Sequence, residues 1–492
     1  MKNRETSAGP LPEHLQPKKK KKVSVKVRAL PDSEEETQLQ KIGRSGLRSM
    51  PSALVSFVFH MILILVIALI YIPGTGEGRF SLFMDTESIE DDFDQEFELS
   101  SDEEFVPEVN AEQMEISSND AAEAFEPELV EIESSAPNPI NPSNNPGFAL
   151  TGRGEQNRQG LLKRFGGTPE TEDAVELGLK WLARNQQRDG SWSLKGPYRS
   201  LVGEENTMAA TGLALLAFLG HGETHQQGKY SKNVAKALKY LIRNQSGNGH
   251  FVERSASLSH SLYSHAICSI SLCELVALTQ DEALIGPARE AVKFASQAQG
   301  KRGGWKYEVG SERSDLSVTG WFIMLFQSAK YAGIEYDPAI LERAEAFVDS
   351  VMLPSGSRFR YESDHEPSLA MTAEGLLCRQ YLGWKQDDSR LAAGAEYLLD
   401  NPIRWSQKNV YYWYYATQVM RNLDEETWEK WNENLKTVLP QKQRKSGVDA
   451  GSWDHEGDPY GGPGGRLYVT CLCIYSLEVY YRHLPIYQMA GR

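Results

Sequence analysis

Residues 185–192 read NQQRDGSW, and related phrases return as NQSGNGHF at 244–251, QGKRGGW at 299–305 and, in part, GSW at 451–453. Each full copy leads from a Gln through a Gly to an aromatic residue. The first copies recur at intervals of about fifty residues. Such a period is typical of an array of repeated supersecondary units rather than of one irregular domain.

Two helical segments accompany each repeat. The first is amphipathic, and copies of it run over 175–186, 234–245, 288–299, 341–351, 392–401 and 426–438. The second is more apolar, and copies of it run over 207–219, 262–275, 315–327, 368–380, 409–420 and 466–479. The spacing of the apolar residues therefore predicts about twelve helices in six pairs.

Two columns appear when the second segments are aligned on their apolar pattern. The first column reads Thr207, Leu262, Asp315, Ser368, Asn409 and Arg466. Four of these six are residue types whose side-chain oxygen accepts a hydrogen bond from a free backbone N–H at a helix N-terminus. Four positions later the column reads Thr211, Ala266, Thr319, Thr372, Trp413 and Thr470. The first column predicts where each second helix begins.

The repeats predict an all-α fold. One helical hairpin cannot bury its apolar face alone, whereas stacked neighbours can. Six such hairpins can close into a ring or stack as an open solenoid, and in a ring the more apolar second helices are expected to form the inner layer. A closed ring, and not an open superhelix, is the condition for a central ligand cavity.

The repeated phrase resembles the QW motif of terpenoid cyclases, a family that shares the α/α-toroid fold with the protein prenyltransferases. The strongest copy comprises Gly178, Leu182, Gln186, Gly190 and Trp192; the second keeps Gln245 and Gly249 with Phe251, the third Gln299, Gly304 and Trp305, and the sixth Gly451 and Trp453. The resemblance covers 155–487, implies an α/α toroid and extends to squalene-cyclase-like proteins of the Planctomycetes type, which carry one N-terminal membrane helix.

The motif has a structural rationale. A Gln at a helix end can bond the free carbonyls there, and Gly permits a left-handed turn out of the helix. The aromatic side chain then packs across the neighbouring hairpin and buries a large apolar area. The motif is therefore specific for a fold and nearly silent about chemistry.

Three carboxyl groups are candidate acids. Class II terpenoid cyclases protonate an alkene with a DxDD motif, which this sequence lacks, so the resemblance does not carry that activity over. Asp315 lies in the capping column, and a catalytic role is the alternative. Glu374 lies on an apolar helix face, where burial would raise its pKa and suit it to general acid catalysis. Asp454 lies in the Gly-rich stretch 452–466.

Aromatic and polar clusters are candidate ligand contacts. The run YYWYY at 411–415 contains Tyr411, Trp413 and Tyr414, and covers every side of a helix. Some of these rings are expected to line the cavity, with core packing as the alternative. His455, Asp458 and Arg466 belong to the Gly-rich stretch, and His265 is a further candidate. His260 and His265 are five residues apart, which is poor geometry for shared metal ligation.

The cysteines indicate neither disulfides nor a cofactor. Cys268, Cys273, Cys378, Cys471 and Cys473 all lie in apolar, helix-like runs. Buried thiols are the favoured interpretation, metal ligation is the second and a disulfide the last. The zinc-ligand spacing of prenyltransferases is not matched, so we expect no metal and no cofactor.

The first 154 residues read as an anchor and a tether. Residues 1–49 are polar and basic, and 51–73 are apolar enough and long enough to form one transmembrane helix. The positive-inside rule places the N-terminus in the cytoplasm. Residues 74–154 include a stretch without Lys or Arg that holds twenty Asp and Glu, and we expect a disordered acidic tether. The toroid domain at 155–487 is then periplasmic, on the inner membrane of a bacterium.

The membrane segment also suggests a partner. Ser56 and His60 are four residues apart and share one helix face, and an ionisable residue in a span is a functional candidate. The pair resembles the Ser-x-x-x-His of TonB-type anchors, which couple to a proton-driven inner-membrane complex. A solvated His60 is the alternative. We expect no nucleic-acid partner.

Two function classes follow. In the first, the toroid binds a lipid, peptide or glycan in its central cavity without cyclase activity of the DxDD type. In the second, it is an enzyme, a polysaccharide lyase or hydrolase or a divergent cyclase-type isomerase, which uses acids at the mouth of the cavity. Because the sequence favours the first only narrowly, enzymatic activity stays undecided here.

Overall fold

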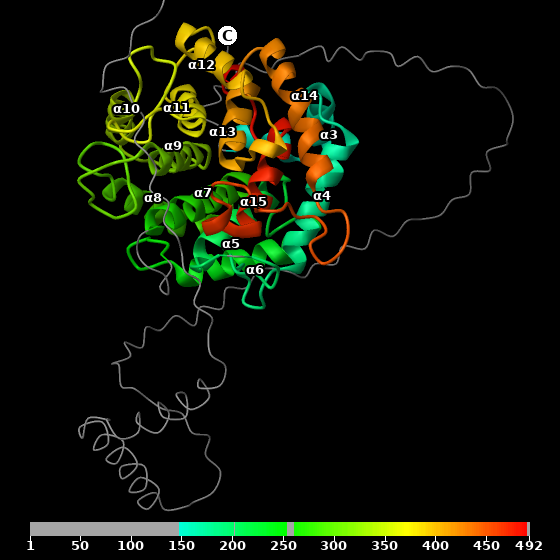
Figure 1. Ribbon diagram of the computed structural model, residues 1–492. Coiled ribbons are helices and arrows are strands. Elements are labelled where there is room, and N and C mark those ends of the chain that lie inside the picture. The colour runs from blue at the N-terminus through cyan, green and yellow to red at the C-terminus, as the bar shows by residue number, and fades with distance from the viewer. Residues whose placement is uncertain (1–146, 201, 253–259, 490–492) are drawn as a thin grey trace, which may run out of the picture. The chain divides into compact units, whose positions relative to one another are not determined.

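Two concentric layers of helices make up the domain, as Figure 1 shows. The computed structural model describes residues 147–200, 202–252 and 260–489. The chain divides into two units, 1–125 and 126–492, and every described residue lies in the second. The described residues form helices and isolated bridges but no strand, which confirms the predicted all-α class.

The inner layer is a closed ring. It consists of α5 (Thr207–Gly220), α7 (Ser261–Thr279), α9 (Leu316–Tyr331), α11 (Leu369–Tyr381), α13 (Val410–Arg421) and α15 (Gly461–Leu477). Each of these helices packs against the next, and α15 packs against α5. Their residues are buried on nearly every side, because the inner helices have neighbours in both layers. The ring and the inner position of the second helices are confirmed.

The outer layer consists of one-sided helices. These are α4 (Pro169–Arg184), α6 (Ser231–Asn244), α8 (Glu282–Gln297), α10 (Ala339–Ser350), α12 (Ser389–Leu399) and α14 (Glu425–Lys442). Each buries the apolar face that its sequence predicts and exposes the opposite face. Helix α4 packs on both α14 and α15, so the first hairpin adjoins the last. The fold is an α/α toroid.

Short elements close one end of the ring. They are η3 (Phe148–Arg153), α3 (Glu155–Arg164), η6 (Glu478–Tyr480) and α16 (Ile486–Met489), while η5 (Trp405–Gln407) lies in a loop before α13. The amide of Gly147 donates to the carbonyl of Tyr331 at 2.7 Å, and that of Leu484 to Ala149 at 3.0 Å. Residues 148–153, which the sequence analysis places in the tether, are therefore packed on the ring.

The Gln of each clasp, as we call the Gln–Gly–aromatic phrase, bridges two outer helices. Gln186 Nε2 donates to the carbonyl of Gly190 at 2.8 Å and to that of Asn233, on the next outer helix, at 2.9 Å. Gln245 and Gln299 make the corresponding bonds. The prediction that Gln bonds the free carbonyls of its own helix end is wrong, because one bond goes to the turn that follows the helix and the other to the next outer helix. The clasp is thus a link between neighbouring repeats.

The aromatic residue of the clasp is held at both polar ends. Trp192 Nε1 donates to the carbonyl of Leu182 at 2.8 Å, and its backbone N–H donates to Thr211 Oγ1 at 3.1 Å. This second bond explains the threonine column, because Thr319, Thr372 and Thr470 accept in the same way from Trp305, Phe359 and Trp453. Phe359 shows that the fourth repeat keeps the clasp geometry although its Gln is lost.

The clasp position requires glycine for two reasons, its positive φ and the lack of room for a Cβ atom. Gly190 has a φ of 96°, and a Cβ there would lie 2.2 Å from the carbonyl oxygen of Lys236 on the next outer helix. In the third copy the left-handed residue is Gly303, with a φ of 88°, and not the neighbouring Gly304 that the sequence alignment selects. Two adjacent glycines made that choice ambiguous from the sequence.

The capping column is partly confirmed. Asp315, Ser368 and Asn409 each accept a hydrogen bond from the backbone N–H three residues later. The first inner helix departs from the column, because Asn206 and not Thr207 is its cap. Thr207 is instead the first residue of α5. The alignment was one residue late at α5 because Asn and Thr are both good capping residues.

The described residues include one helix, α7, that is long and apolar enough to cross a membrane by length and composition. It is 83% buried within the ring, so its apolar surface is explained by core packing. The predicted span at 51–73, with Ser56 and His60, lies outside the described residues.

Candidate functional site at the mouth of the ring

The N-terminal ends of the inner helices gather at one mouth of the ring. The side-chain Nδ2 of Asn206 donates to Ser264 Oγ at 2.9 Å, which joins the start of α5 to the first turn of α7. The loops before α9 and α11 fold back over this mouth. There the amides of Leu262 and Leu316 donate to the carbonyls of Tyr307 and Tyr361. These bonds place two loop tyrosines above the inner helices.

A chain of hydrogen bonds leads from the mouth to a buried carboxyl group. The hydroxyl of half-buried Tyr263 lies 2.5 Å from Ser317 Oγ, which lies 2.9 Å from the hydroxyl of Tyr411. Tyr411 in turn donates to the carboxyl of Glu374, at 3.1 Å from each oxygen. Four inner helices contribute one residue each.

Glu374 is held in an apolar wall of the ring. Its side chain is fully buried, and burial raises its pKa well above the usual range, against the hydrogen bonds from nearby tyrosines. A Cβ on Gly320 would lie 2.2 Å from Glu374 Oε1, so the glycine of α9 makes room for this carboxyl group. Burial therefore favours the protonated form of the group, which can donate a hydrogen bond.

Asp315 is the second buried acid of the mouth. Its Oδ1 accepts from the amide of Val318 at 2.8 Å, while its buried Oδ2 has no hydrogen-bond partner by geometry among the described residues. Burial raises its pKa to about 6, although the bond to Val318 opposes this. The two carboxyl groups also interact, because Asp315 contributes to the raised pKa of Glu374. Asp315 is thus both a helix cap and a weakened acid.

Tyrosine rings form the rim of the site. The rings of Tyr263 and Tyr307 lie 6.0 Å apart, and the hydroxyls of Tyr307 and Tyr361 lie 2.5 Å apart. Tyr460, 5.5 Å from the ring of Tyr411, is 41% exposed. The rim thus offers both aromatic faces and hydroxyl groups to solvent.

The interior beyond the mouth is filled with large side chains. Trp321, Met324 and Tyr414 are each almost completely buried there. The cavity that they line, which Gln327 and Tyr381 share, has a volume of only about 20 Å³. That volume accommodates roughly one water molecule. The wide central cavity that the sequence analysis expects is absent from this part of the ring.

Of the residues predicted from the sequence, Asp315, Glu374 and Tyr411 come together. Tyr414 lies deeper, with its ring 5.6 Å from that of Tyr475. Trp413 packs at 6.1 Å against Trp405 of η5. The aromatic run therefore divides between the mouth, the filled interior and the outer layer.

The Gly-rich stretch 452–466 is held by internal bonds. Asp454 lies 2.8 Å from Arg466 and 2.5 Å from Arg444. Although burial raises the pKa of Asp454, these arginines lower it below its ordinary value. The carboxylate is therefore ionised and cannot serve as the proton donor that the sequence suggests. Asp458 accepts from the amides of Val410 and Tyr460, so it organises the start of α13.

The two candidate histidines are buried. His265 Nδ1 accepts from the amide of Phe251, and its Nε2 lies 3.1 Å from the carbonyl of Ala291. His265 thus replaces the clasp threonine in the second repeat, and burial lowers its pKa well below the usual range. His455 is also buried, with its Nδ1 3.7 Å from Glu456. Neither of them lies with Glu374 and Asp315.

The rim tyrosines were missed by reading the sequence. Tyr307 and Tyr361 each follow a clasp aromatic residue, Trp305 or Phe359, by two positions. Because the clasp fixes the aromatic residue against the ring, the residue two positions later falls over the mouth in both repeats. The offset from the clasp was thus the available signal.

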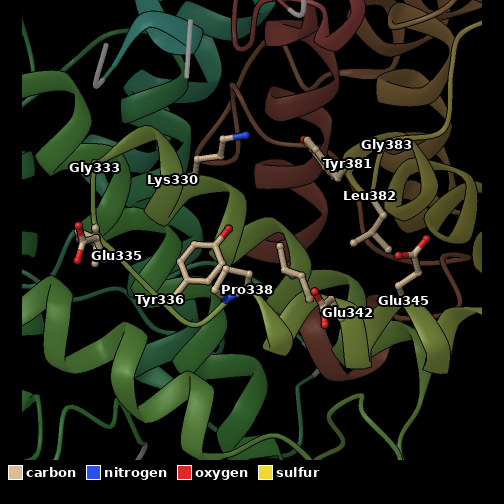
Figure 2. A pocket seen from close by; sticks show the side chains of 12 residues that line it. Lys330, Gly333, Glu335, Tyr336, Pro338, Glu342, Glu345, Tyr381, Leu382 and Gly383 are labelled. Atoms are coloured by element: carbon tan, nitrogen blue, oxygen red, sulfur yellow. The ribbon is translucent and has the colours of Figure 1, made fainter. Parts of the chain in front are cut away.

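A shallow groove lies at the other end of α9. It has a volume of about 720 Å³ and runs between the start of α10 and the end of α11. Figure 2 shows that Glu335 stands well apart from Glu342 and Glu345 around this groove. Its carboxylates do not converge, and it contains none of the predicted site residues.

A buried ionic cluster closes the end of the ring opposite the mouth. Arg153 of η3 lies 2.7 Å from Glu274 of α7, and Arg482 lies 2.6 Å from Glu478. Nearby, Glu172, Glu176 and His221 are close enough to share a cation, but Arg158 lies 3.1 Å from Glu172. That guanidinium already supplies the positive charge, so the cluster is built from ion pairs.

Comparisons with known proteins concern the fold. No family model matches the sequence, and no curated protein is significantly similar. The type II terpene cyclase MstE from Scytonema is 14% identical with a TM-score of 0.43, over 63% of this chain and 98% of that chain. An inactive variant of the α-1,6-mannanase GH76A of Salegentibacter, in complex with α-1,6-mannotriose, is 13% identical with a TM-score of 0.45, over 63% and 99%. An α-amylase from Clostridium perfringens is 12% identical with a TM-score of 0.43, over 63% and 97%.

Proposed function

We propose that the domain binds a neutral glycan at the tyrosine-lined mouth of the ring. The observation that carries this proposal is the rim of Tyr263, Tyr307, Tyr361 and Tyr460 above the hydroxyl chain to Glu374. Aromatic faces pack on the apolar faces of sugar rings, and hydroxyl and protonated carboxyl groups exchange hydrogen bonds with sugar hydroxyls. The four rim side chains are uncharged tyrosines, so a neutral ligand is favoured.

A glycan is favoured over the lipid and peptide that the sequence analysis also considered. A lipid chain needs an apolar cavity that buries most of its length, and such ligand pockets measure about 300–1,000 Å³. The cavity lined by Trp321, Met324 and Tyr414 inside the ring offers only about 20 Å³. A peptide would need partners for its backbone N–H and C=O groups, whereas the rim presents side-chain hydroxyls.

The binding proposal is tested by removing one rim ring. The full-length chain is screened on a glycan array, and its strongest ligand is titrated by calorimetry. Tyr307→Ala is expected to weaken binding at least tenfold, because a stacked ring and its bond to Tyr361 are lost. The matched control is Tyr336→Ala, in the groove at the other end of α9, which should leave affinity unchanged. Absence of glycan binding, or unchanged affinity in Tyr307→Ala, would refute the proposal.

A second candidate function is acid catalysis on such a glycan. It is favoured by the raised pKa values of Asp315 and Glu374 and by the hydrogen-bonded chain from Glu374 to Tyr263, which can carry a proton to the mouth. The enzymatic function is tested by measuring new reducing ends from the bound glycan. Glu374→Gln should keep affinity and abolish turnover, and turnover in the wild type should fall above about pH 6, where Asp315 ionises. Binding without turnover at any pH leaves the domain a binding module.

We also keep the anchor as a proposal. Residues 51–73 would hold the domain on the periplasmic side of an inner membrane, and Ser56 and His60 would contact a proton-driven partner. Replacing His60 by Ala and measuring co-purification with inner-membrane proteins tests the second part. Unchanged partners would end it.

A further inference from the structure

Arg421 is a buried cation that has no counter-ion among the residues the structure describes. It is the last residue of α13 and is 6% exposed. Its Nε and Nη2 atoms are buried and make no hydrogen bond within the described residues, and no salt bridge to it occurs there. A buried charge is costly unless it is paired, and ordinary structural arginines satisfy this requirement with a carboxylate or carbonyl groups. The guanidinium of Arg421 therefore requires a partner from outside.

Aromatic rings hold the guanidinium in place. Its central carbon lies 3.2 Å from the centroid of the Phe165 ring and 5.8 Å from that of Trp428. The aromatic faces stabilise a cation partly, but they do not satisfy its N–H donors. Trp428 is itself fixed, because its Nε1 donates to the carbonyl of Phe165 at 2.9 Å. The platform is thus built before any ligand arrives.

A second guanidinium converges on the same ring. The central carbon of Arg164 lies 5.1 Å from the centroid of Phe165. Burial, together with the charge of Arg164, lowers the pKa of Arg421 to about 9, so Arg421 is still charged at pH 7. Two like charges that share one aromatic ring repel each other, and an anion between them would remove this repulsion.

These groups line a cavity of suitable size. It measures about 510 Å³ and lies between the α3–α4 connection and α14, with Lys163 and Lys436 also in its lining. Helices α3 and α14 lie next to each other in Figure 1. Glu425, Glu429 and Glu433 line the outer side on α14, and Glu433 pairs with Lys436 at 2.9 Å. None of these three carboxylates forms a salt bridge with Arg421 in the described structure.

We propose that Arg421 and Arg164 form an anion-binding site in this cavity, which receives a phosphate or carboxylate group. Planar guanidinium groups bind both oxyanions through paired N–H···O bonds. Phe165 and Trp428 would contact the remainder of the ligand. This site is separate from the tyrosine-lined mouth, so the proposal does not depend on glycan binding.

The site is tested by anion-dependent stability of the full-length chain. The thermal midpoint is measured against inorganic phosphate and, separately, acetate, with ionic strength held constant by sodium chloride. The wild type is expected to gain about 2 °C with the preferred anion, because binding to the folded state alone stabilises it. Phosphate and carboxylate ligands are distinguished by which of the two salts acts at lower concentration.

Variants assign the response to the two arginines. Arg421→Met should lose the response and should not unfold earlier than the wild type in anion-free buffer, because it removes an unpaired buried charge. Arg164→Gln, at an exposed position, should retain the fold and lose at least half of the response. Arg404→Gln, an exposed arginine away from the cavity, is the matched control and should respond fully. The proposal is overturned if neither anion acts on the wild type, or if Arg164→Gln responds like the control.

Discussion

Asp315 serves two purposes with opposite electrostatic requirements. As the cap of α9 it accepts from the amide of Val318, and a charged oxygen accepts more strongly. As a fully buried group beside Glu374 it avoids charge, and burial raises its pKa to about 6. The unfolded chain releases this proton near its ordinary pKa of 3.8. Folding therefore takes up a proton between these values, and Asp315 lowers stability as the pH rises through this window.

Asp315→Asn removes that pH dependence and keeps a capping side chain. The free energy of unfolding of the variant, relative to the wild type, should increase by about 2 kcal/mol between pH 4.5 and pH 8. Urea denaturation of the full-length chain at both pH values measures the difference. Asp424→Asn is the control, because Asp424 caps α14 at an exposed position and hydrogen bonds to Thr427 lower its pKa despite partial burial. A pH-independent difference for Asp315→Asn would contradict the assignment.

The sequence predicts part of the mouth for reasons that apply to single residues. Asp315 and Glu374 are recognisable because carboxyl groups are rare in apolar inner helices. Tyr263 and Ser317 carry no such signal, since tyrosine and serine are common in buried helices with many partners. Asp454 was predicted as an acid from its residue type. Its charge is decided by Arg444 and Arg466, which lie ten and twelve residues away in the sequence and pair with it only in the folded chain. Pairing of this kind is a property of the folded chain.

At the scale of elements, the clasp depends on the close approach of a turn to the next outer helix. Gly303 illustrates this, because a Cβ there would lie 2.2 Å from the carbonyl oxygen of Arg343. Gly310 also has a positive φ, of 71°, but has nothing within 4 Å of its Cβ position. A substitution at Gly310 would therefore cause backbone strain alone, whereas one at Gly303 would cause both backbone strain and a steric clash.

Gly303→Ala should therefore destabilise the domain more than Gly310→Ala. We expect about 3 kcal/mol for the first, from strain and displacement of α10, and about 1 kcal/mol for the second, from strain alone. Urea denaturation measures both. Equal losses would mean that the turn can move away from α10, and the clasp would then not fix the outer layer.

The helices were predictable because their apolar periods are long and regular. Each of the twelve helices of the two layers overlaps a segment assigned from the sequence, but several extend beyond it: α4 begins at Pro169 and α15 at Gly461. The threonine column was visible too, but its purpose was not, because Thr211 Oγ1 accepts from the backbone N–H of Trp192 across a loop. The loop tyrosines and the packed residues 148–153 lack periodicity, and only tertiary contacts give them their positions.

At the scale of the molecule, the contact that closes the ring, between the first and last hairpins, differs from the contacts between hairpins that follow each other in the chain. Neighbouring hairpins in the middle of the chain stay together because they are covalently connected, even when a contact between them is lost. The first and last hairpins have no such connection within the ring. They are held by packing of α4 on α14 and α15, by packing of α5 on α15 and by the sixth clasp. The Gln of that clasp is Gln443, which was not recognised from the sequence, and its Nε2 donates to the carbonyl of Ala174 at 2.7 Å.

Closure without a wide interior also changes what the ring can do. Large aromatic side chains of the inner helices fill its centre, which the apolar sequence pattern could not reveal because core and cavity walls have the same composition. Buried ion pairs of Arg153 and Arg482 close one end of the ring, and tyrosines surround the other. A ligand would bind at the end that remains accessible.

Gln443→Ala should consequently lower the free energy of unfolding more than Gln186→Ala does. Both side chains donate one bond within their own turn and one to another outer helix, at 3.0 and 2.7 Å for Gln443 and at 2.8 and 2.9 Å for Gln186. Loss of two bonds costs about 2 kcal/mol in either case, and opening of the ring adds to this only at Gln443. Hydrogen exchange should show faster opening of α4 and α14 together in Gln443→Ala, and only local loss of protection in Gln186→Ala. If both variants show the same local pattern, the covalent connections and the packing of α15 on α5 suffice to keep the ring closed, and the last clasp is no more important than the others.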